Sequence, residues 1–530
     1  MYIFVLKIIN KLLNILGLFF EFINPSKKKF FRILYKKLNI KKKTYKNIIL
    51  FDHFNSFNHQ LIRSLLLNSL SSHFKGNLVC FNYSYSPFLN ELYKIINIKK
   101  FIKSNYVEKL EFQNIKQIYK IEEKKIKSKK DLMKYKFREF EIGIDIYETY
   151  LIRFRKVTIN ISDKKFKKLL LIAIKRIIYW EEYFKKNKVI AISITHRNYL
   201  DTNLICKIGY KYNVPVFTFG GTGRRIGRFY GSELNSHIYL KKIFKSLRPN
   251  EKKIGINFSK KQIKKRFSGK IGVDMNYSEK SAFTKFDKHK KILDTNDRLK
   301  VLICTHCFYD NPHAYGGNLF NDFFEWLTFL SKISHKTNYE WYIKPHPDYL
   351  PGTIENIKII SKEFKRIKLI DPSTSFHQLA KEGLRFALTV YGSVAHELPL
   401  LGIDVINADI NNPHCSFDFS HTPKNLKEYK KILLNLKNIK SKLKNKNQIH
   451  EFYYIYNNFL NNKNLLVKDY DLFDKNYFKD YKTFYQYFID NVSKKQISNF
   501  ERKLKIFFKS DYKYLLEEYK QKIIYKYEKY

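Results

Sequence analysis

The sequence predicts an α/β protein in which two parallel sheets, each flanked by its own helices, face a cleft. Short apolar runs alternate with helical patterns in two separate series along the 530 residues, and a polar, lysine-rich stretch separates the series. Polar residues and glycines follow several of the apolar runs, at the sheet edge where parallel strands gather ligand-binding groups. Hydrophobic residues make up 44% of the chain, enough for folded domains of this kind.

The first series has four expected strands, at 47–51, 77–81, 188–194 and 214–219. Between the second and third strands, residues 100–140 are rich in lysine and have a helical pattern. The fourth strand leads into a glycine cluster that ends in Arg224 and Arg225. The cluster matches a dinucleotide-binding fingerprint only loosely. We interpret it as a loop that carries Arg224 and Arg225 towards an anionic ligand, with a plain surface turn as the alternative.

The second series has five expected strands, at 299–304, 339–344, 367–370, 386–391 and 404–408. Helical patterns separate them, and a helical segment rich in Lys, Tyr and Phe follows. The predicted organisation is two Rossmann-like domains joined by a linker. Its parts are an N-terminal segment at 1–44, the first domain at 45–250, the linker at 251–297, the second domain at 298–422 and a helical C-terminal segment at 423–530.

The N-terminal segment predicts an amphipathic helix over residues 2–24, followed by basic clusters at 28–30 and 41–43. Such a helix with a polybasic flank suits the anionic inner face of a cytoplasmic membrane. A helix that packs on the protein's own core is the open alternative. The five cysteines are scattered and no cleavable signal is visible. We therefore expect a cytoplasmic protein that is peripheral on the inner membrane face.

The formal net charge of +53 raises the question of nucleic acid as a partner. Lys, Asn, Ile, Tyr and Phe are abundant together while Gly, Pro and Met are scarce, which indicates A+T-rich coding rather than a dedicated surface. Arginine, which recognises bases and phosphates with its planar fork, is rare beside lysine. We predict no nucleic-acid partner. Cys304 and Cys307 lack the further ligands that zinc needs, so no metal site is predicted either.

The stretch 339–348 joins a buried strand to the turn Lys344-Pro345-His346-Pro347. The two prolines fix their own φ angles and keep the preceding residues extended, so the chain leaves the sheet rigidly. Lys344 and His346 are thereby held at the carboxyl edge of the sheet. The stretch 390–397 repeats this arrangement with a strand, a glycine turn and a helix that begins near Ser393. Two such strand ends in one sheet predict an anion-binding site.

Four motifs of the second series resemble bacterial capsule and surface-polysaccharide biosynthesis proteins, which are glycosyltransferase-like proteins of the GT-B architecture. The resemblance covers about 300–415 in detail and the first half only in layout. The order and spacing of these short motifs are more specific than any one of them. The motifs are Thr305-His306-Cys307-Phe308-Tyr309-Asp310-Asn311-Pro312-His313, Asn318-Leu319-Phe320, Ile343-Lys344-Pro345-His346-Pro347 and Tyr391-Gly392-Ser393-Val394-Ala395-His396-Glu397.

The resemblance implies a donor site in the second domain. Lys344 and His346 would bind the phosphates of a nucleotide-activated sugar, and Ser393 would add a hydroxyl donor. Glu397 would accept hydrogen bonds from the ribose hydroxyls, with His313 nearby as a further donor-binding residue. The nucleotide-sugar is a substrate, so no cofactor is expected, and no metal is required if these groups carry the charge.

The acceptor half of the site is less defined. Deprotonation of an acceptor hydroxyl needs a base, and Asp310 and His196 are the candidates, each just after a strand on the cleft side. Asp52, His53, Arg224 and Arg225 are candidates for binding the acceptor or an anion.

The predicted function is a glycosyltransferase that acts on a surface polysaccharide or a lipid-linked acceptor, with other capsule-assembly proteins as further partners. A polyol-phosphate transferase of the teichoic-acid type and a non-catalytic capsule-assembly protein are the alternatives.

Overall fold

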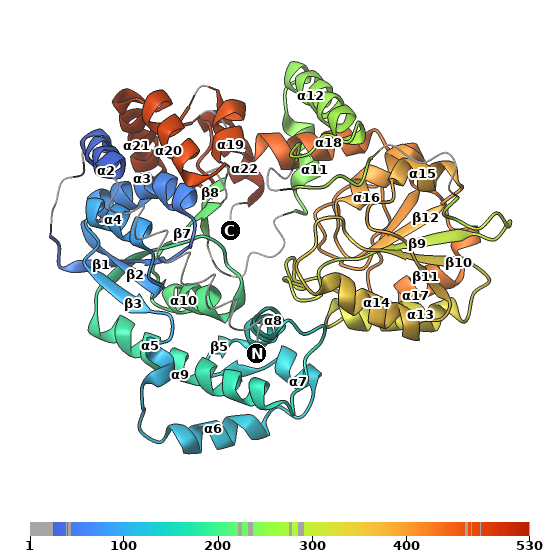
Figure 1. Cartoon of the computed structure of the whole chain (residues 1–530), viewed down its shortest axis with the longest axis horizontal. Coiled ribbons are helices and arrows are strands. Elements are labelled where there is room, and N and C mark those ends of the chain that lie inside the picture. The colour runs from blue at the N-terminus through green and yellow to red at the C-terminus, as the bar shows by residue number, and fades with distance from the viewer. Residues whose placement is uncertain are drawn as a thin grey trace.

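The two predicted series form two separate sheets, and all their strand pairs are parallel except one (Figure 1). This computed structural model describes residues 25–38, 40, 44–220, 225–229, 231, 237–274, 278–284, 291–461, 465–467, 469–477 and 479–528. The prediction of an α/β architecture with parallel sheets is confirmed. The helix predicted over residues 2–24 lies outside the described residues, as does Arg224.

The first sheet has the strand order β3-β2-β1-β6-β7-β8. The chain winds outwards from β1 to β3, then returns to the other side of β1 and continues through β6 and β7. The order therefore reverses between β1 and β6. Strand β8 pairs antiparallel with β7 at the edge. The strands are β1 (Asn47–Asp52), β2 (Gly76–Tyr83), β3 (Lys100–Lys103), β6 (Val189–Ile194), β7 (Val216–Gly220) and β8 (Arg225–Phe229).

Both faces of the first sheet are covered, because alternate residues of each strand point to opposite faces. Ile49 and Phe51 of β1 pack in a core with α3, whereas Leu50 packs in another with α8, α9 and α10. The helices of this half are α2 (Pro25–Leu38), α3 (Phe57–Phe74), α4 (Pro87–Ile95), α5 (Tyr106–Lys109), α6 (Ile115–Lys124), α7 (Lys129–Met133), α8 (Gly143–Phe154), α9 (Lys164–Lys186) and α10 (Tyr199–Lys211). A short hairpin of β4 (Lys136–Phe137) and β5 (Phe140–Glu141) precedes α8.

The second sheet is parallel throughout and has the order β11-β10-β9-β12-β13. Its order reverses between β9 and β12, so a crevice is expected outside the carboxyl ends of these two strands. The strands are β9 (Lys300–Cys304), β10 (Glu340–Lys344), β11 (Ile367–Leu369), β12 (Phe386–Thr389) and β13 (Asp404–Asn407). The helices are α13 (Phe323–Ser334), α14 (Thr353–Glu363), α15 (Phe376–Lys381), α16 (Val394–Glu397) and α17 (Leu426–Leu434).

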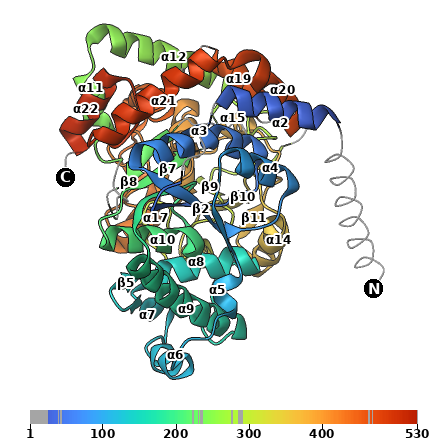
Figure 2. The same ribbon diagram turned by 90° about the vertical axis from the view of Figure 1, so that its left-hand side faces the viewer.

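The C-terminal segment leaves the second sheet and returns to the first, as Figures 1 and 2 show. Arg228 of β8 donates to the backbone carbonyls of Phe507 and Ser510, and Asn58 of α3 donates to the carbonyl of Tyr477. The elements of this path are α18 (Gln448–Tyr454), the π-helix η4 (Ile455–Phe459), α19 (Tyr470–Tyr477), α20 (Tyr481–Asn491), α21 (Lys494–Lys509) and α22 (Glu518–Glu528).

Three elements differ from the sequence prediction. Strand β3 lies in a stretch predicted to be helical, and it was missed because it is a sheet edge in which only Ile102 is buried. Residues 225–229, predicted as part of a loop, form β8. Helix α12 (Pro249–Phe267) runs past residue 251, where the predicted linker begins, and α11 (Leu240–Ser246) precedes it. Helix α12 has little amphipathic pattern because only Gly255, Ser259 and Ile263 are buried.

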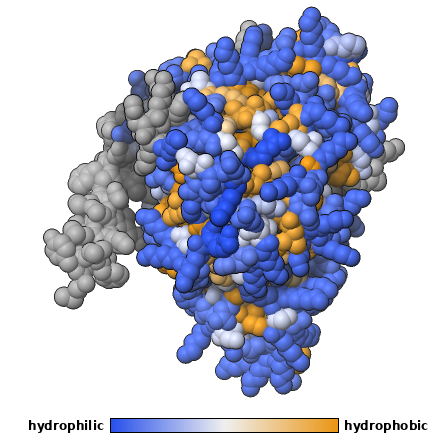
Figure 3. Space-filling view, turned by 90° about the vertical axis from the view of Figure 1, so that its right-hand side faces the viewer, coloured by the Kyte–Doolittle hydropathy of each residue, from blue (hydrophilic) through white to orange (hydrophobic). Residues whose placement is uncertain are grey.

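Helix α12 approaches α18 closely at Gly255. A Cβ atom at this position would lie 2.4 Å from the ring of Tyr454, so a glycine is required for the contact. No helix among the described residues is long and apolar enough to cross a membrane. Figure 3 shows the end of the molecule formed by the second sheet and its helices, where hydrophilic side chains cover most of the surface. This surface agrees with a solvating role for much of the lysine content.

Candidate functional site

A cavity of about 590 Å³ lies at the carboxyl ends of β9, β10 and β12. This is the crevice expected from the strand order of the second sheet. Other walls come from the first sheet, through Gly220 and Arg225, and from residues near the end of α12. Of the residues predicted for the site, the structure brings five to the cavity wall. These are Lys344, His346, Ser393, Glu397 and Arg225.

Lys344 ends β10 and is buried, with 2% of its surface exposed. Its Nζ donates to the carbonyl oxygen of Pro372 at 2.7 Å and lies 4.8 Å from the ring centre of Phe376. Burial lowers the pKa of the ammonium to about 8, although Cys304 and Asp371 oppose the shift. One of three ammonium donors is satisfied among the described residues, so Lys344 can offer donors to an anion in the cavity.

His346 lies between the two prolines of the turn, where its Nδ1 is 2.8 Å from the carbonyl oxygen of Asp348 and 3.1 Å from the backbone nitrogen of the same residue. These contacts fix the ring and leave Nε2 for another partner. Burial lowers the pKa of His346, while Asp348 and Glu397 act in the opposite direction. The imidazole is therefore mostly neutral at pH 7, and a phosphate beside it would favour the protonated form.

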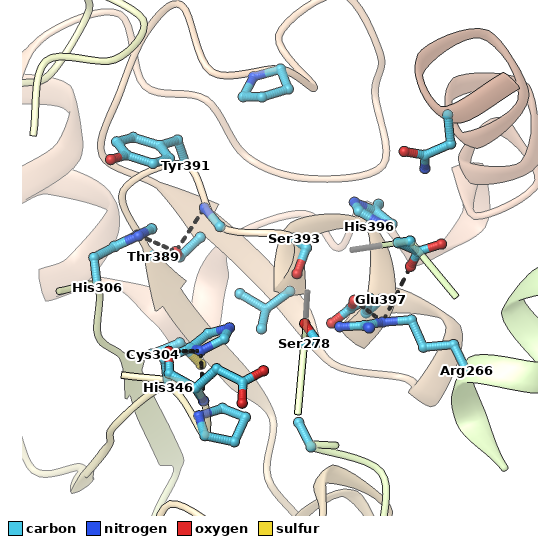
Figure 4. A pocket seen from close by; sticks show the side chains of 18 of the residues that line it. Arg266, Ser278, Cys304, His306, His346, Thr389, Tyr391, Ser393, His396 and Glu397 are labelled. Atoms are coloured by element: carbon cyan, nitrogen blue, oxygen red, sulfur yellow. Dashed lines mark hydrogen bonds and ion pairs between the residues drawn. The ribbon is translucent and has the colours of Figure 1, made fainter. Parts of the chain in front are cut away.

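Ser393 precedes α16 and does not cap the backbone of this four-residue helix. Its hydroxyl instead donates to the carboxylate of Glu397, and Arg266 of α12 forms a close ion pair with the same carboxylate. Burial tends to raise the pKa of Glu397, but Arg266 overcomes this effect and the pKa is lowered. In the view of Figure 4, Ser393 lies between the His306–Thr389 contact and the Arg266–Glu397 pair. Glu397 is thus held ionised.

His306 and Thr389 link the ends of β9 and β12 beneath the cavity. His306 Nε2 lies 3.0 Å from Thr389 Oγ1 and accepts a hydrogen bond from the backbone N–H of Val390 at 3.3 Å. Burial lowers the pKa of His306 to about 3, so the ring is neutral. The N–H of Gly392 donates to Thr389 Oγ1 at 3.0 Å. A Cβ atom at Gly392 would come within 2.7 Å of that oxygen, so the turn needs glycine.

Asp310 and His196 are not among the residues that form the cavity wall. Asp310 is exposed and accepts a hydrogen bond from the hydroxyl of Tyr199 at 2.7 Å. Burial lowers the pKa of His196, whereas the charges of Asp52 and Asp310 raise it. Because Asp310 acts on His196, the two candidate bases lie within electrostatic reach of each other, one from each half of the chain.

The side chain of His313 contacts α8 and does not line the cavity. Its backbone N–H donates to the carboxylate of Glu148 at 3.0 Å, and its Nδ1 lies 3.3 Å from the same oxygen. The side chain is buried between the two halves, with its ring 5.8 Å from that of Tyr147. The structure therefore does not bring His313 together with Lys344 and His346 in the cavity wall.

Asp52 and His53 also have partners inside the first half. Asp52 forms a buried ion pair with Arg63, at 2.6 Å between Nη2 and Oδ1, and accepts from the backbone N–H of Thr195 at 3.0 Å. His53 Nδ1 lies 2.9 Å from the hydroxyl of Tyr93, and burial lowers the pKa of His53 to about 4. Neither residue lines the cavity.

Sequence reasoning did not select several residues of the wall. Arg266 lies in a polar helix without a recognisable motif, and it reaches the site only through the fold. His306 and Tyr391 stood in the quoted motifs without an assigned role, and the glycine turn at 392 was the signal that could have drawn attention to them. No group of three or more His, Cys, Asp or Glu side chains in the described ranges is arranged to hold a metal ion.

No protein-family model matches the chain, and no curated protein sequence matches it. Several solved structures are similar at low scores. UDP-GlcNAc 2-epimerase from Neisseria meningitidis, bound to UDP-GlcNAc, is 10% identical over 76% of this chain and 97% of that chain, with a TM-score of 0.20. A glycosyltransferase from Rickettsia africae is 10% identical over 78% and 94%, with a TM-score of 0.23.

HepE from Anabaena, in complex with UDP, is 9% identical over 78% of this chain and 95% of that chain, with a TM-score of 0.25. TM-scores this low do not establish a shared fold.

Proposed function

We propose that the protein transfers a sugar from a nucleotide-activated donor to a surface polysaccharide or glycolipid acceptor. One observation carries the proposal: Lys344, His346 and Ser393 converge on a cavity at the carboxyl ends of a parallel sheet, beside the ionised Glu397. Lys344 and a protonated His346 can donate hydrogen bonds to phosphate oxygens, Ser393 can do so once its hydroxyl turns away from Glu397, and Glu397 can accept hydrogen bonds from sugar hydroxyls.

Charge development explains how this set would promote transfer. When the bond between the sugar and the nucleotide breaks, negative charge grows on the leaving phosphate. The protonated Lys344 would stabilise that charge. His346 would do so as well, because it becomes protonated once the phosphate is beside it. They act strongly because the cavity wall around Lys344 is buried and excludes water. The nucleotide-sugar is the substrate of this reaction, and no separate cofactor or metal is assigned to it.

Asp310 and His196 are proposed to remove the proton from the acceptor hydroxyl. Asp310 is exposed and held by Tyr199, so it is open to an acceptor that approaches from the side of the first sheet. His196 is neutral near pH 7 because burial lowers its pKa. A neutral imidazole or an ionised carboxylate can each serve as a general base.

The motif resemblance supports a capsular or related surface acceptor. The basic clusters at 28–30 and 41–43, which follow the predicted amphipathic helix, support a peripheral position on the anionic inner face of the cytoplasmic membrane, where a lipid-linked acceptor would be available. Other capsule-assembly proteins are proposed as further partners, and nucleic acid is not proposed.

A panel of nucleoside mono- and diphosphates and their sugars, scored by thermal shift, tests the proposal. A nucleotide that stabilises the wild-type protein should stabilise Lys344→Ala and Ser393→Ala less, while Lys362→Ala, a change on α14 outside the cavity wall, should respond like wild type. Transfer of radiolabel from the sugar of that donor then separates a glycosyltransferase from a polyol-phosphate transferase. Equal stabilisation of all variants would show that the nucleotide does not bind at this site. Binding without any transfer would favour a non-catalytic role.

A further inference from the structure

One wall of the cavity comes from β8 and η4 rather than from the strand ends of the second sheet. Tyr456 and Asn457 of η4 both line the cavity. A π-helix is rare, because its hydrogen bonds skip an additional residue, and it is often found at functional sites. Helix η4 lies where the chain passes from the second half back to the first, so its side chains can lie between the two halves.

Arg225 is the cation of this wall. Its guanidinium carbon lies 4.8 Å from the ring centre of Tyr456, and its Nη2 donates to the carbonyl oxygen of Tyr456 at 3.0 Å. Among the described residues, no carboxylate pairs with Arg225, whereas Arg266 contacts both Glu397 and Asp274. A guanidinium has five N–H donors in a fixed fork, so Arg225 retains donors and an uncompensated charge at the wall.

Aromatic rings and an amide surround this cation. Phe452 stacks on Tyr456 with 5.2 Å between ring centres and an interplanar angle of 18°. His237 contacts both Tyr456 and Tyr315, at 5.8 Å and 5.1 Å between ring centres. Tyr456 is therefore held firmly against its neighbours. A half-buried aromatic ring suits the apolar C–H face of a sugar, and the amide of Asn457 suits its hydroxyl edge.

We propose that Arg225 and Tyr456 form a subsite for a sugar ring that carries an acidic group, a carboxylate or a phosphate. Tyr456 and Asn457 contact the ring, and Arg225 binds the acidic group through two parallel hydrogen bonds. This inference rests on the proposed function, since it assigns the cavity to carbohydrate. The acidic ring belongs either to the donor or to the end of the acceptor.

Two matched ligand pairs test the subsite, each differing only in charge. The pairs are methyl glucuronide with methyl glucoside, and UDP-glucuronic acid with UDP-glucose. Affinities measured by ligand-observed NMR and calorimetry should favour the acidic member of at least one pair by about ten- to a hundredfold in wild type. Arg225→Gln should abolish that preference, and Arg502→Gln, which changes an exposed arginine of α21, should retain it.

Two further variants distinguish a loss of the subsite from a loss of folding. Arg225→Lys keeps the charge and loses the fork, so its preference should be intermediate. Tyr456→Leu should lower the affinity for both ligands of a pair by the same factor. A preference confined to the nucleotide pair assigns the acidic ring to the donor, and one confined to the glycoside pair assigns it to the acceptor.

The proposal is overturned if wild type shows no acidic preference in either pair, or if Arg225→Gln keeps the preference. An Arg225-dependent glycoside preference without binding of any nucleotide would refute the proposed function and leave the subsite standing. Nucleotide binding that depends on Lys344, without any preference for the acidic ligand, would refute the subsite and leave the proposed function standing.

Discussion

The hydroxyl of Tyr199 donates a 2.7 Å hydrogen bond to the carboxylate of Asp310, and this bond joins the first residue of α10 to the loop after β9. It therefore connects the carboxyl edges of the two sheets. Tyr199 has a φ of +61°, in the left-handed region that a bulky side chain rarely adopts. Such a conformation costs about 1–3 kcal/mol and persists where the surroundings require it, often at functional sites.

Tyr199→Phe should therefore lower catalysis more than stability. The ring and backbone remain, but Asp310 loses the donor that orients it. Because hydrogen bonds to charged groups contribute about 1.5–3 kcal/mol, we expect a loss of roughly ten- to a hundredfold in kcat/KM. Initial rates with the donor found by the nucleotide panel measure this. Tyr85→Phe, at an exposed tyrosine, is the control, and an unchanged rate in Tyr199→Phe would exclude the role.

The lowered pKa of Lys344 predicts that nucleotide binding depends on pH. Its folded-state pKa of about 8 lies below the usual value of 10.5, so the ammonium loses its charge as pH rises through 8. Nucleotide affinity should fall between pH 7 and pH 9, and Lys344→Met should bind weakly with little change over that range. Calorimetric titrations across this window measure both. A wild-type affinity that stays constant to pH 9 would contradict a charged Lys344 at the phosphates.

The same shift has a consequence for stability. Between pH 8 and 10.5 the unfolded chain binds a proton at Lys344 that the folded chain does not, so this group contributes stability as pH rises. Below pH 8 its buried charge opposes folding. Lys344→Met should therefore unfold at a temperature no lower than wild type at pH 7. A thermal melt checks this, and a large drop would instead assign Lys344 a structural role.

Asp52 should prove important for folding rather than for acid–base chemistry. It pairs with Arg63, and the side chains are 3% and 0% exposed. Asp52→Ala leaves the guanidinium buried without its partner, which costs about 3–5 kcal/mol. Urea denaturation measures the loss. Glu91→Ala, which breaks an exposed pair with Lys94, should cost less than about 1 kcal/mol. Lost activity in a fully stable Asp52→Ala protein would point to catalysis instead.

The sequence predicted the parts of the fold and site that depend on local pattern. Buried parallel strands are apolar on both faces, so most strands could be located, and two prolines around His346 indicated a rigid strand end. The edge strand β3 could not be found, because only Ile102 among its residues is buried. Strand β8 could not be found because its arginines suggest a loop, although Arg228 is buried against backbone carbonyls.

The unpredicted parts of the site depend on contacts between residues far apart in the chain. Arg266 lies 131 positions from Glu397, and Tyr456 lies 231 positions from Arg225. No periodicity or spacing reports such a contact. His313 shows the converse: it stands in a motif beside Asp310, yet a carboxylate of α8 holds it outside the cavity wall.

Arg266 provides the sharpest test of the donor site, because it keeps Glu397 ionised in a buried position. The folded-state pKa of Glu397 is below its usual 4.5, so the pair contributes stability above pH 4.5 that is lost as pH falls through the folded-state value. In Arg266→Gln the buried carboxylate loses its partner, and burial then raises its pKa. The variant should be less stable than wild type by about 3 kcal/mol at pH 7.

This stability difference should narrow as the pH falls from 7 through the raised pKa of Glu397 in the variant, because a protonated Glu397 no longer needs a cation. Denaturation of both proteins between pH 4 and 7 measures the trend. Arg298→Gln, which removes a partly exposed pair with Glu340, provides the matched control. In Arg266→Gln, Glu397→Gln should restore part of the lost stability at pH 7, since it removes the unpaired charge. A difference between wild type and Arg266→Gln that is constant with pH would mean that Arg266 acts through packing and not through Glu397.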